Sequence, residues 1–295
     1  MERHQITGHT ELIGLLAYPI RHSQSPATHN AAYEKLGVDI VNLAFEVDAP
    51  ELEDAIKGLR ALKLRGANVS MPNKTIVHQY LDEISPAARL CGAVNTIVNK
   101  DGYLVGHITD GIGYIQSLKD NDIDPAGKKL TIVGSGGAAT AVEIQAALDG
   151  VAEMSIFARD DKFKQNALDT VKKINENTNC KATFYPLENL DKLKEEMHSS
   201  YLFTTATGGG MKPLEGITYI PDSSFFRPDL IVTDVVYAPH ETAMLKMARH
   251  AGCKTMNGQG MMLFQAIAAI ELILGKRVDS EYMKEKLGIS YVYED

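Results

Sequence analysis

The chain has 295 residues, of which 44% are hydrophobic and 23% are charged, and its formal net charge is -8. This composition is typical of a soluble globular protein, and the length favours two domains. The negative charge argues against nucleic acid or an anionic membrane surface as the main partner. No apolar run reaches the roughly 18 residues of a membrane span. Three scattered cysteines and the lack of a signal-peptide core favour a cytoplasmic protein with reduced thiols.

Strand and helix patterns alternate along the first third of the chain. The first helix is expected to begin with Ser25 as its N-cap and Pro26 in its first position, and Gly37 ends it. The predicted elements are strands at 11–17, 41–47 and 66–71, helices at 26–36, 50–62 and from about 73, and a hairpin at 93–109.

The alternation starts again at Lys128, which predicts parallel strands joined by helical crossovers in an α/β fold. The last long helix is apolar on nearly every side and is therefore expected to be buried. The predicted elements are a strand, glycine turn and helix over 129–150, strands at 153–161, 182–187, 201–207 and 229–237, and helices at 162–177, 189–198, 241–252 and 260–275.

A glycine motif lies between the strand and the helix of the segment 129–150. Gly134, Gly136 and Ala139 fit the pattern G-x-G-x-x-G/A. Glycines at these positions permit a tight turn and a close approach of the backbone to a pyrophosphate, which the helix N-terminus then receives. We therefore predict dinucleotide binding. The alternative is a tight turn in another kind of doubly wound domain.

The next strand ends in the run Arg159-Asp160-Asp161, which bears on the choice of cofactor. An acid about 20 residues after the glycines can hydrogen-bond the hydroxyls of the adenosine ribose. A 2'-phosphate needs an arginine and is repelled by carboxylates. Two adjacent acids therefore favour NAD over NADP, although a solvated charge run is the alternative interpretation.

Lys74 and Asp110 are candidates for acid–base chemistry. Lys74 follows a strand end and a proline in NVSMPNK, and Asp110 begins a helix in HITDGIGY. A hydride-transferring enzyme needs a group that handles the proton of the hydroxyl, and a lysine can serve. A carboxylate at a helix N-terminus is held by backbone N–H groups. The alternatives are a surface lysine and a simple N-cap.

The segment PIRHSQSPATHN places Ser23 and Ser25 at a turn from strand to helix. Hydroxyl and N–H donors in such a turn can hold a carboxylate or a polyol, and helix capping is the alternative. His22 and His29 lie nearby without a third ligand at metal spacing, so no metal site is predicted.

Taken together, these segments resemble the shikimate dehydrogenase family, and more closely its quinate/shikimate dehydrogenase branch. The matching segments occur in the family order and span nearly the whole chain. They are PIRHSQSPATHN, GANVSMPNK, SPAARLCGAVNTIVN, HITDGIGY, GSGGAA, TATGGGMKP, DVVYAPH and NGQGMMLFQA.

The resemblance implies a Rossmann-type doubly wound NAD(P) domain (111–259). That domain is inserted after an N-terminal α/β substrate domain (1–110), which C-terminal helices (260–295) complete, with the active site in the cleft. It also implies reversible hydride transfer between NAD(P) and a ring hydroxyl of shikimate or quinate, giving the 3-dehydro ketone. Such an enzyme serves chorismate and aromatic amino acid biosynthesis, or the use of quinate.

The resemblance also implies roles for individual residues. Lys74 and Asp110 match the catalytic pair, and Ser23 and Ser25 match the serines that bind the substrate carboxylate. Positions around the ring hydroxyls are matched by Asn68, Ser70, Asn95, Thr109, Tyr237 and Gln265. Cofactor positions are matched by Gly134, Ser135, Gly136, Gly137, Ala138, Ala158, Arg159, Asp160, Asp161, Thr205, Val235 and Gly258.

Ala158 and Thr205 stand where the family usually has asparagine, so the sequence departs from the pattern on the cofactor side. Two other functions remain open. One is an enzyme similar to methylene-tetrahydrofolate dehydrogenase, and the other is a ligand-sensing relative without catalysis, against which the retained Lys74 and Asp110 argue. The apolar strand at 11–17 could also pair with a second copy, which leaves a homodimer open.

Overall fold

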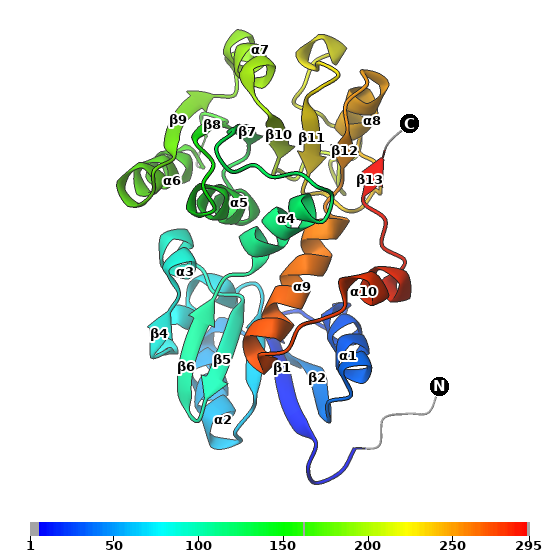
Figure 1. Cartoon of the computed structure of the whole chain (residues 1–295). Helices are drawn as coiled ribbons and strands as arrows, with labels where there is room; N and C mark the ends of the chain where they lie inside the picture. The colour runs from blue at the N-terminus through cyan, green and yellow to red at the C-terminus, as the bar shows by residue number, and fades with distance from the viewer. Residues whose placement is uncertain (1–5, 162, 294–295) are drawn as a thin grey trace. The chain divides into compact units, whose positions relative to one another are not determined.

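The computed structural model describes residues 6–161 and 163–293. The chain divides into two units, each built on its own sheet (Figure 1). The first unit runs to Thr109 and includes Leu263–Ile289, and the second comprises Asp110–Met262 and the residues from Ser290 onward. This confirms the predicted α/β fold with one unit inserted into the other.

The first unit contains a six-stranded sheet with the order β2-β1-β3-β5-β6-β4. The connection from β1 through α1 to β2 runs one way along the sheet, and the connection from β2 through α2 to β3 runs the other way. Because both crossovers are right-handed, α1 and α2 lie on opposite faces of the sheet. The elements are β1 (Glu11–Ala17), α1 (Ser25–Leu36), β2 (Ile40–Glu46), η1 (Ala49–Glu51), α2 (Leu52–Ala61), β3 (Gly66–Val69), η2 (Asn73–Thr75), η3 (Val77–Tyr80), β4 (Glu83–Ile84), α3 (Pro86–Cys91), β5 (Thr96–Lys100), β6 (Tyr103–His107) and α10 (Ser280–Leu287).

Strand β1 has a hydrogen-bonded neighbour on each side. It pairs in parallel with β2 and with β3, and its last five residues are buried. Both edges of the strand are therefore occupied within the unit. Pairing of this strand with a second copy, the basis on which a homodimer was left open, is wrong for that reason.

The start of α1 differs from the prediction. Gln24 occupies the N-cap position without a side-chain cap, and Ser25 is already helical. The hydroxyl of Ser23 instead accepts a hydrogen bond from the Ser25 N–H at 3.2 Å. Capping by Ser25, which the sequence suggested, is therefore wrong, because its backbone lies inside the first turn.

Strand β3 ends at Val69, two residues before the predicted end. The N–H of Asn73 donates to the carbonyl of Ser70 at 2.9 Å, which turns the chain away from the sheet. The carbonyl of Lys74 accepts the N–H of Val94 at 2.8 Å. This turn and its tie to the neighbouring segment fix the backbone that carries Ser70 and Lys74.

The second unit contains a seven-stranded sheet with the order β13-β12-β11-β10-β7-β8-β9. Without β13 this is the 3-2-1-4-5-6 order of dinucleotide-binding domains. Helices α4, α5 and α6 pack together on one side of the sheet, and α7 and α8 lie on the other (Figure 1). The elements are α4 (Asp110–Lys119), β7 (Lys129–Val133), α5 (Gly137–Leu148), β8 (Glu153–Ala158), α6 (Lys164–Asn177), β9 (Lys181–Pro186), α7 (Leu190–Ser199), β10 (Leu202–Thr205), η4 (Ser223–Phe225), β11 (Ile231–Asp234), α8 (Ala243–His250), β12 (Thr255–Met256) and β13 (Val292–Tyr293).

The C-terminal segment differs from the predicted division of the chain. Strand β13 pairs antiparallel with β12, and the carbonyl of Ser290 lies 2.7 Å from a ring nitrogen of His240. The segment therefore extends the second sheet, although residues 260–295 were all expected in the first domain. Helix α9 (Gln259–Leu274) starts in the second unit, and its residues from Leu263 belong to the first.

Helix α4 is anchored on the second sheet by a buried tyrosine. The hydroxyl of Tyr114 hydrogen-bonds those of Thr204 and Thr233, and burial raises its pKa to about 12. One turn earlier, a Cβ on Gly111 would come within 2.2 Å of the carbonyl oxygen of Ala141 on α5. These two contacts fix the N-terminal turn of α4, which begins at Asp110.

Helix α5 carries an unusual buried acid. The side chain of Glu143 is fully buried, and among the described residues neither of its carboxylate oxygens has a hydrogen-bond partner. Burial without a partner penalises the ionised form, which raises the pKa of Glu143 from 4.5 to about 8. The carboxyl group is therefore mainly protonated at neutral pH.

None of the described helices is long and apolar enough to cross a membrane.

We expect Glu143 to make the protein less stable as the pH rises. A carboxyl whose pKa is raised on folding stabilises fully below its unfolded pKa, near 4.5, and this contribution is lost as the pH rises through about 8. Between these two pKa values the free energy of unfolding should fall by about 1.4 kcal/mol per pH unit because of Glu143. Chemical denaturation between pH 5 and 9 should show a flatter profile for Glu143→Gln, whereas the exposed control Glu176→Gln should follow the wild type. A wild-type slope in Glu143→Gln would contradict this assignment.

Candidate active site

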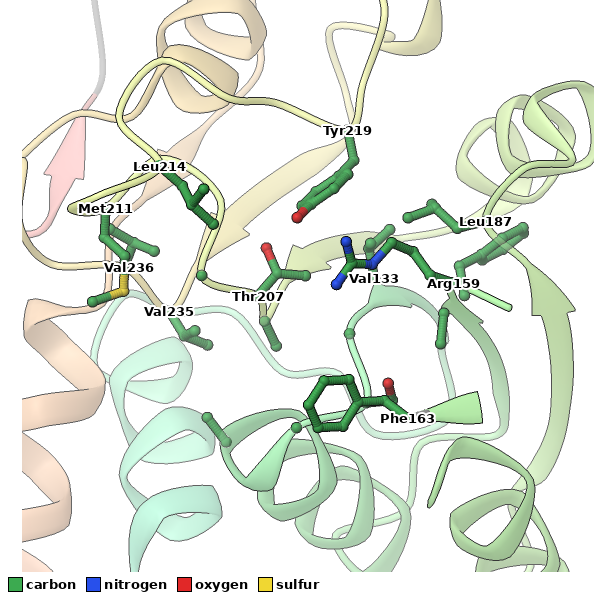
Figure 2. A pocket seen from close by; sticks show the side chains of 18 of the residues that line it. Val133, Arg159, Phe163, Leu187, Thr207, Met211, Leu214, Tyr219, Val235 and Val236 are labelled. Atoms are coloured by element: carbon green, nitrogen blue, oxygen red, sulfur yellow. The ribbon is translucent and has the colours of Figure 1, made fainter. Parts of the chain in front are cut away.

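A cavity of about 470 Å³ opens at the carboxyl ends of β7, β8, β10 and β11 (Figure 2). The order of the sheet reverses between β7 and β10, and ligands of open α/β sheets bind at such a switch point. Four short stretches at the ends of these strands form most of the wall, and they are residues 133–138, 157–159, 206–208 and 235–238.

The glycine turn after β7 is held tightly against the end of β10. Gly134 has φ of 150°, and a Cβ there would come within 2.4 Å of the Ala206 carbonyl oxygen, so only glycine fits. A Cβ on Gly136 or Gly137 would instead meet nothing within 4 Å. Gly136 is the N-cap of α5 and has no side chain with which to cap the helix. The first N–H groups of α5 are therefore available to a ligand.

Such a turn fits a dinucleotide. An anion at the N-terminus of α5 would meet backbone N–H donors and the positive end of the helix dipole. The side-chain amide of Asn166 on α6 supports the turn, because it donates to the Ser135 carbonyl at 2.6 Å and to the Thr140 hydroxyl at 3.0 Å. The predicted residues from Gly134 to Ala138 all line the cavity.

The acids after β8 are paired locally. Asp160 forms an ion pair with Lys164 at 2.9 Å and does not line the cavity. Asp161 lines it, and its carboxylate pairs with Arg159 at 3.2 Å and accepts the N–H of Phe163 at 2.9 Å. Each carboxylate therefore faces a cation. The repulsion of a 2'-phosphate that the sequence suggested is weakened for that reason.

The wall at the end of β11 depends on a buried carboxylate. Asp234 accepts hydrogen bonds from the Val236 N–H at 3.0 Å and from the Thr242 hydroxyl at 2.9 Å. Burial raises its pKa to about 6, and the two hydrogen bonds oppose that shift. On the other side, a Cβ on Gly258 would lie 2.0 Å from the carbonyl oxygen of Val235. Val235 and Val236, which line the cavity, are thus held from both sides.

Three further predicted residues, Thr205, Gly258 and Tyr237, lie near this wall. Thr205 is buried and Gly258 supports Val235 from behind, and neither lines the cavity. Tyr237, which was expected near the ring hydroxyls of the substrate, is half-exposed and lines the same cavity as Val235.

The first unit contains its own cluster of predicted polar residues. The side chain of Asn95 is buried and hydrogen-bonds Thr109. Its amide nitrogen donates to the Thr109 hydroxyl at 3.0 Å, and its amide oxygen accepts the Thr109 backbone N–H at 2.9 Å. The backbone carbonyl of Asn95 accepts the N–H of Val69, next to Asn68. The buried Oδ1 of Asn68 has no partner among the described residues. It is therefore a candidate acceptor for a ligand hydroxyl.

Other predicted residues are carried by the two units separately. Ser23 and Ser25 lie at the start of α1, Lys74 lies in η2, and Gln265 lies half-buried on α9 in the part assigned to the first unit. Asp110 begins α4 of the second unit. Among the described residues, no group of three His, Cys, Asp or Glu side chains could hold a metal ion.

The sequence prediction missed several residues that shape the cavity. Phe163, Leu187 and Tyr219 line it, and Asn166 and Asp234 support its walls. Asp234 precedes Val235 directly, so its place at a strand end was a usable signal. Tyr219 carried none, because its loop reaches the cavity only through the tertiary fold.

Proteins of high similarity cover nearly the whole chain. A curated shikimate dehydrogenase (NADP(+)) from Listeria innocua is 58% identical over 96% of this chain and 97% of its own length. A shikimate dehydrogenase (NADP(+)) from Streptococcus uberis is 50% identical, again over 96% of this chain and 97% of its own length. A crystal structure of shikimate 5-dehydrogenase from Listeria monocytogenes, in complex with shikimate and NAD, superposes with a TM-score of 0.94 at 57% identity. It covers 97% of this chain and 99% of that one.

These names bear on the predicted preference for NAD. Curated relatives are named for NADP(+), whereas the solved Listeria monocytogenes protein contains NAD. The relatives thus point to a pyridine nucleotide and do not support the preference predicted from Asp160 and Asp161. The physical reason is that Lys164 and Arg159 offset the charges of these two acids.

The model of the shikimate dehydrogenase substrate binding domain matches residues 15–97, the part that carries the serine turn, Lys74 and Asn95. The rest of the chain is covered by the relatives at 50% identity and above. The chain therefore belongs to the shikimate dehydrogenase family.

Proposed function

We propose that this protein catalyses the reversible oxidation of shikimate to 3-dehydroshikimate with a pyridine nucleotide. The observation that carries the proposal is 58% identity to a curated shikimate dehydrogenase over 96% of this chain and 97% of that one. Lys74 and Asp110 are both retained, which argues against a non-catalytic relative. The relatives described above also favour this activity over that of a methylene-tetrahydrofolate dehydrogenase.

The catalytic roles belong, in this proposal, to Lys74 and Asp110. A bound pyridine nucleotide would supply the hydride acceptor for the ring carbon that bears the reacting hydroxyl. Lys74 hydrogen-bonds the oxygen of the reacting hydroxyl and stabilises the negative charge that develops on it, and Asp110 supplies a carboxylate for proton handling. A rigid turn suits Lys74, because a misplaced group loses much of the proximity advantage.

Substrate binding is assigned to polar groups that the backbone of the first unit holds. Ser23 and Ser25 donate to the substrate carboxylate at the start of α1. The amide oxygen of Asn68 accepts one ring hydroxyl, and the paired Asn95 and Thr109 offer further donors and acceptors. Ser70, Tyr237 and Gln265 complete the assignment.

Quinate is proposed as a secondary substrate, and NADP as the preferred cofactor. A quinate dehydrogenase from Corynebacterium glutamicum, solved in complex with NAD, is 28% identical to this chain with a TM-score of 0.84. For the cofactor, the names of the curated relatives and the position of Arg159 at the cavity wall support NADP. The free cysteines support a cytoplasmic location.

A turnover assay with shikimate or quinate, each with NAD or NADP, tests the proposed function. We expect the highest kcat/KM for shikimate with NADP. Quinate, the proposed secondary substrate, should have a kcat/KM roughly 10- to 100-fold lower. The formation of reduced nicotinamide would be followed by absorbance. No turnover of shikimate with either nucleotide would refute the proposed activity, and a preference for quinate would refute the assigned substrate.

Replacing Lys74 with alanine should lower kcat for shikimate by at least about 100-fold and change KM less, as expected when acid–base help is lost. The hydrogen bond from Val94 is to the backbone carbonyl of Lys74 and is retained. Lys57→Ala is the matched control. Among the described residues, the ion-pair partners of Lys57 are Glu53 and Asp54, which lie on the same helix. A kcat close to that of the wild type would remove Lys74 from the mechanism.

Arg159 provides a test of the cofactor proposal. We expect Arg159→Ala to lower kcat/KM for NADP by about 10- to 150-fold, the value of a charge-assisted phosphate contact, and kcat/KM for NAD much less. For NADP, the kcat/KM of Arg159→Lys should lie between those of the wild type and Arg159→Ala, because lysine keeps the positive charge without the planar guanidinium. Equal losses with both nucleotides would show that Arg159 does not bind a 2'-phosphate.

A further inference from the structure

Phe163 exposes an aromatic ring at the wall of the cavity. It is the N-cap residue of α6, 44% of its surface is exposed, and its ring projects into the cavity (Figure 2). An exposed phenylalanine has no polar atom in its side chain with which to bind a ligand. Its contribution to the cavity is therefore a flat apolar surface.

Asp161 fixes the position of this surface and of a neighbouring cation. Its carboxylate accepts the backbone N–H of Phe163 at 2.9 Å and pairs with the guanidinium of Arg159 at 3.2 Å. Figure 2 shows the side chains of Arg159 and Phe163 both directed into the cavity, where Leu187 and Tyr219 add apolar surface. One carboxylate thus holds a cation and a ring at the same end of the cavity.

The topology of the sheet indicates which part of a nucleotide meets this end. The glycine turn after β7 receives the pyrophosphate, and the adenosine of a dinucleotide lies toward the next strand, β8. Arg159 and Phe163 both follow β8 directly. A planar heteroaromatic base beside a phenylalanine ring gains stacking energy that does not depend on the ribose substituent.

We propose that Phe163 is the adenine-stacking residue of this protein and that Asp161 is a positioning residue for Phe163 and Arg159. The inference rests on the proposed nucleotide site and deepens it. Affinity for adenine comes from the ring and is shared by NAD and NADP, whereas a 2'-phosphate is sensed by Arg159. Asp161 is then a support for the wall, and the predicted hydrogen bond to the ribose is not needed.

Calorimetric titration with ADP and with adenosine 2',5'-bisphosphate tests the stacking role. Phe163→Ala should weaken both ligands by the same factor, about 5- to 150-fold, with an unchanged thermal unfolding midpoint. Phe163→Tyr should restore binding. Leu190→Ala is the matched control, because Leu190 is 41% exposed and does not line the cavity. An effect of Phe163→Ala below about twofold, or an equal loss in Leu190→Ala, would overturn the proposal.

Two variants of Asp161 test the positioning role by the same titrations. Asp161→Asn keeps an oxygen that can accept the Phe163 N–H, so ADP binding should stay within about twofold of the wild type. Asp161→Ala loses both contacts and should weaken both ligands. Unchanged ADP binding in Asp161→Ala would refute this role. Neither ligand contains nicotinamide and no shikimate is present, so these results stand or fall separately from turnover.

Discussion

The close approach of Gly134 to Ala206 is the constraint on which the nucleotide cavity depends. The two backbones come so near that a Cβ on Gly134 would lie 2.4 Å from the Ala206 oxygen, and this contact joins the ends of β7 and β10 at the switch point of the sheet. The N-terminus of α5 consequently opens into the cavity, with Asn166 holding the turn from α6. A larger residue at position 134 would separate the two loops.

Carboxylates near the cavity act mainly on the protein itself. Asp161 pairs with Arg159 and the Phe163 backbone, and Asp234 holds the Val236 backbone and the Thr242 hydroxyl. Both acids follow or end strands of the second sheet, where the chain leaves its regular hydrogen bonding. Their oxygens replace the lost ladder partners and so give the loop walls a defined shape. A ligand can then bind with little reordering of these loops.

The first unit fixes its polar residues by a different means. Asn95 bonds Thr109 through both its amide nitrogen and its oxygen, and Lys74 and Val94 are joined through the backbone. Several side chains proposed to bind shikimate therefore project from segments that these hydrogen bonds hold in place. This arrangement limits their freedom before the substrate arrives, which favours catalysis.

The sequence by itself determined the alternation of strands and helices, the glycine turn and the family. Apolar periodicity, glycine positions and motif order are local properties, so β7, α5 and the start of α4 at Asp110 could all be predicted. The pairing of strands across the sheets could not be predicted. Strand β13 joins β12 and β1 has no free edge only because the folded chain brings these strands together. The same holds for the site, where Lys74 and Gly134 to Ala138 carried recognisable motifs. The full burial of Glu143 and the places of Leu187 and Tyr219 at the cavity wall depend on packing against distant segments, which only the tertiary structure decides.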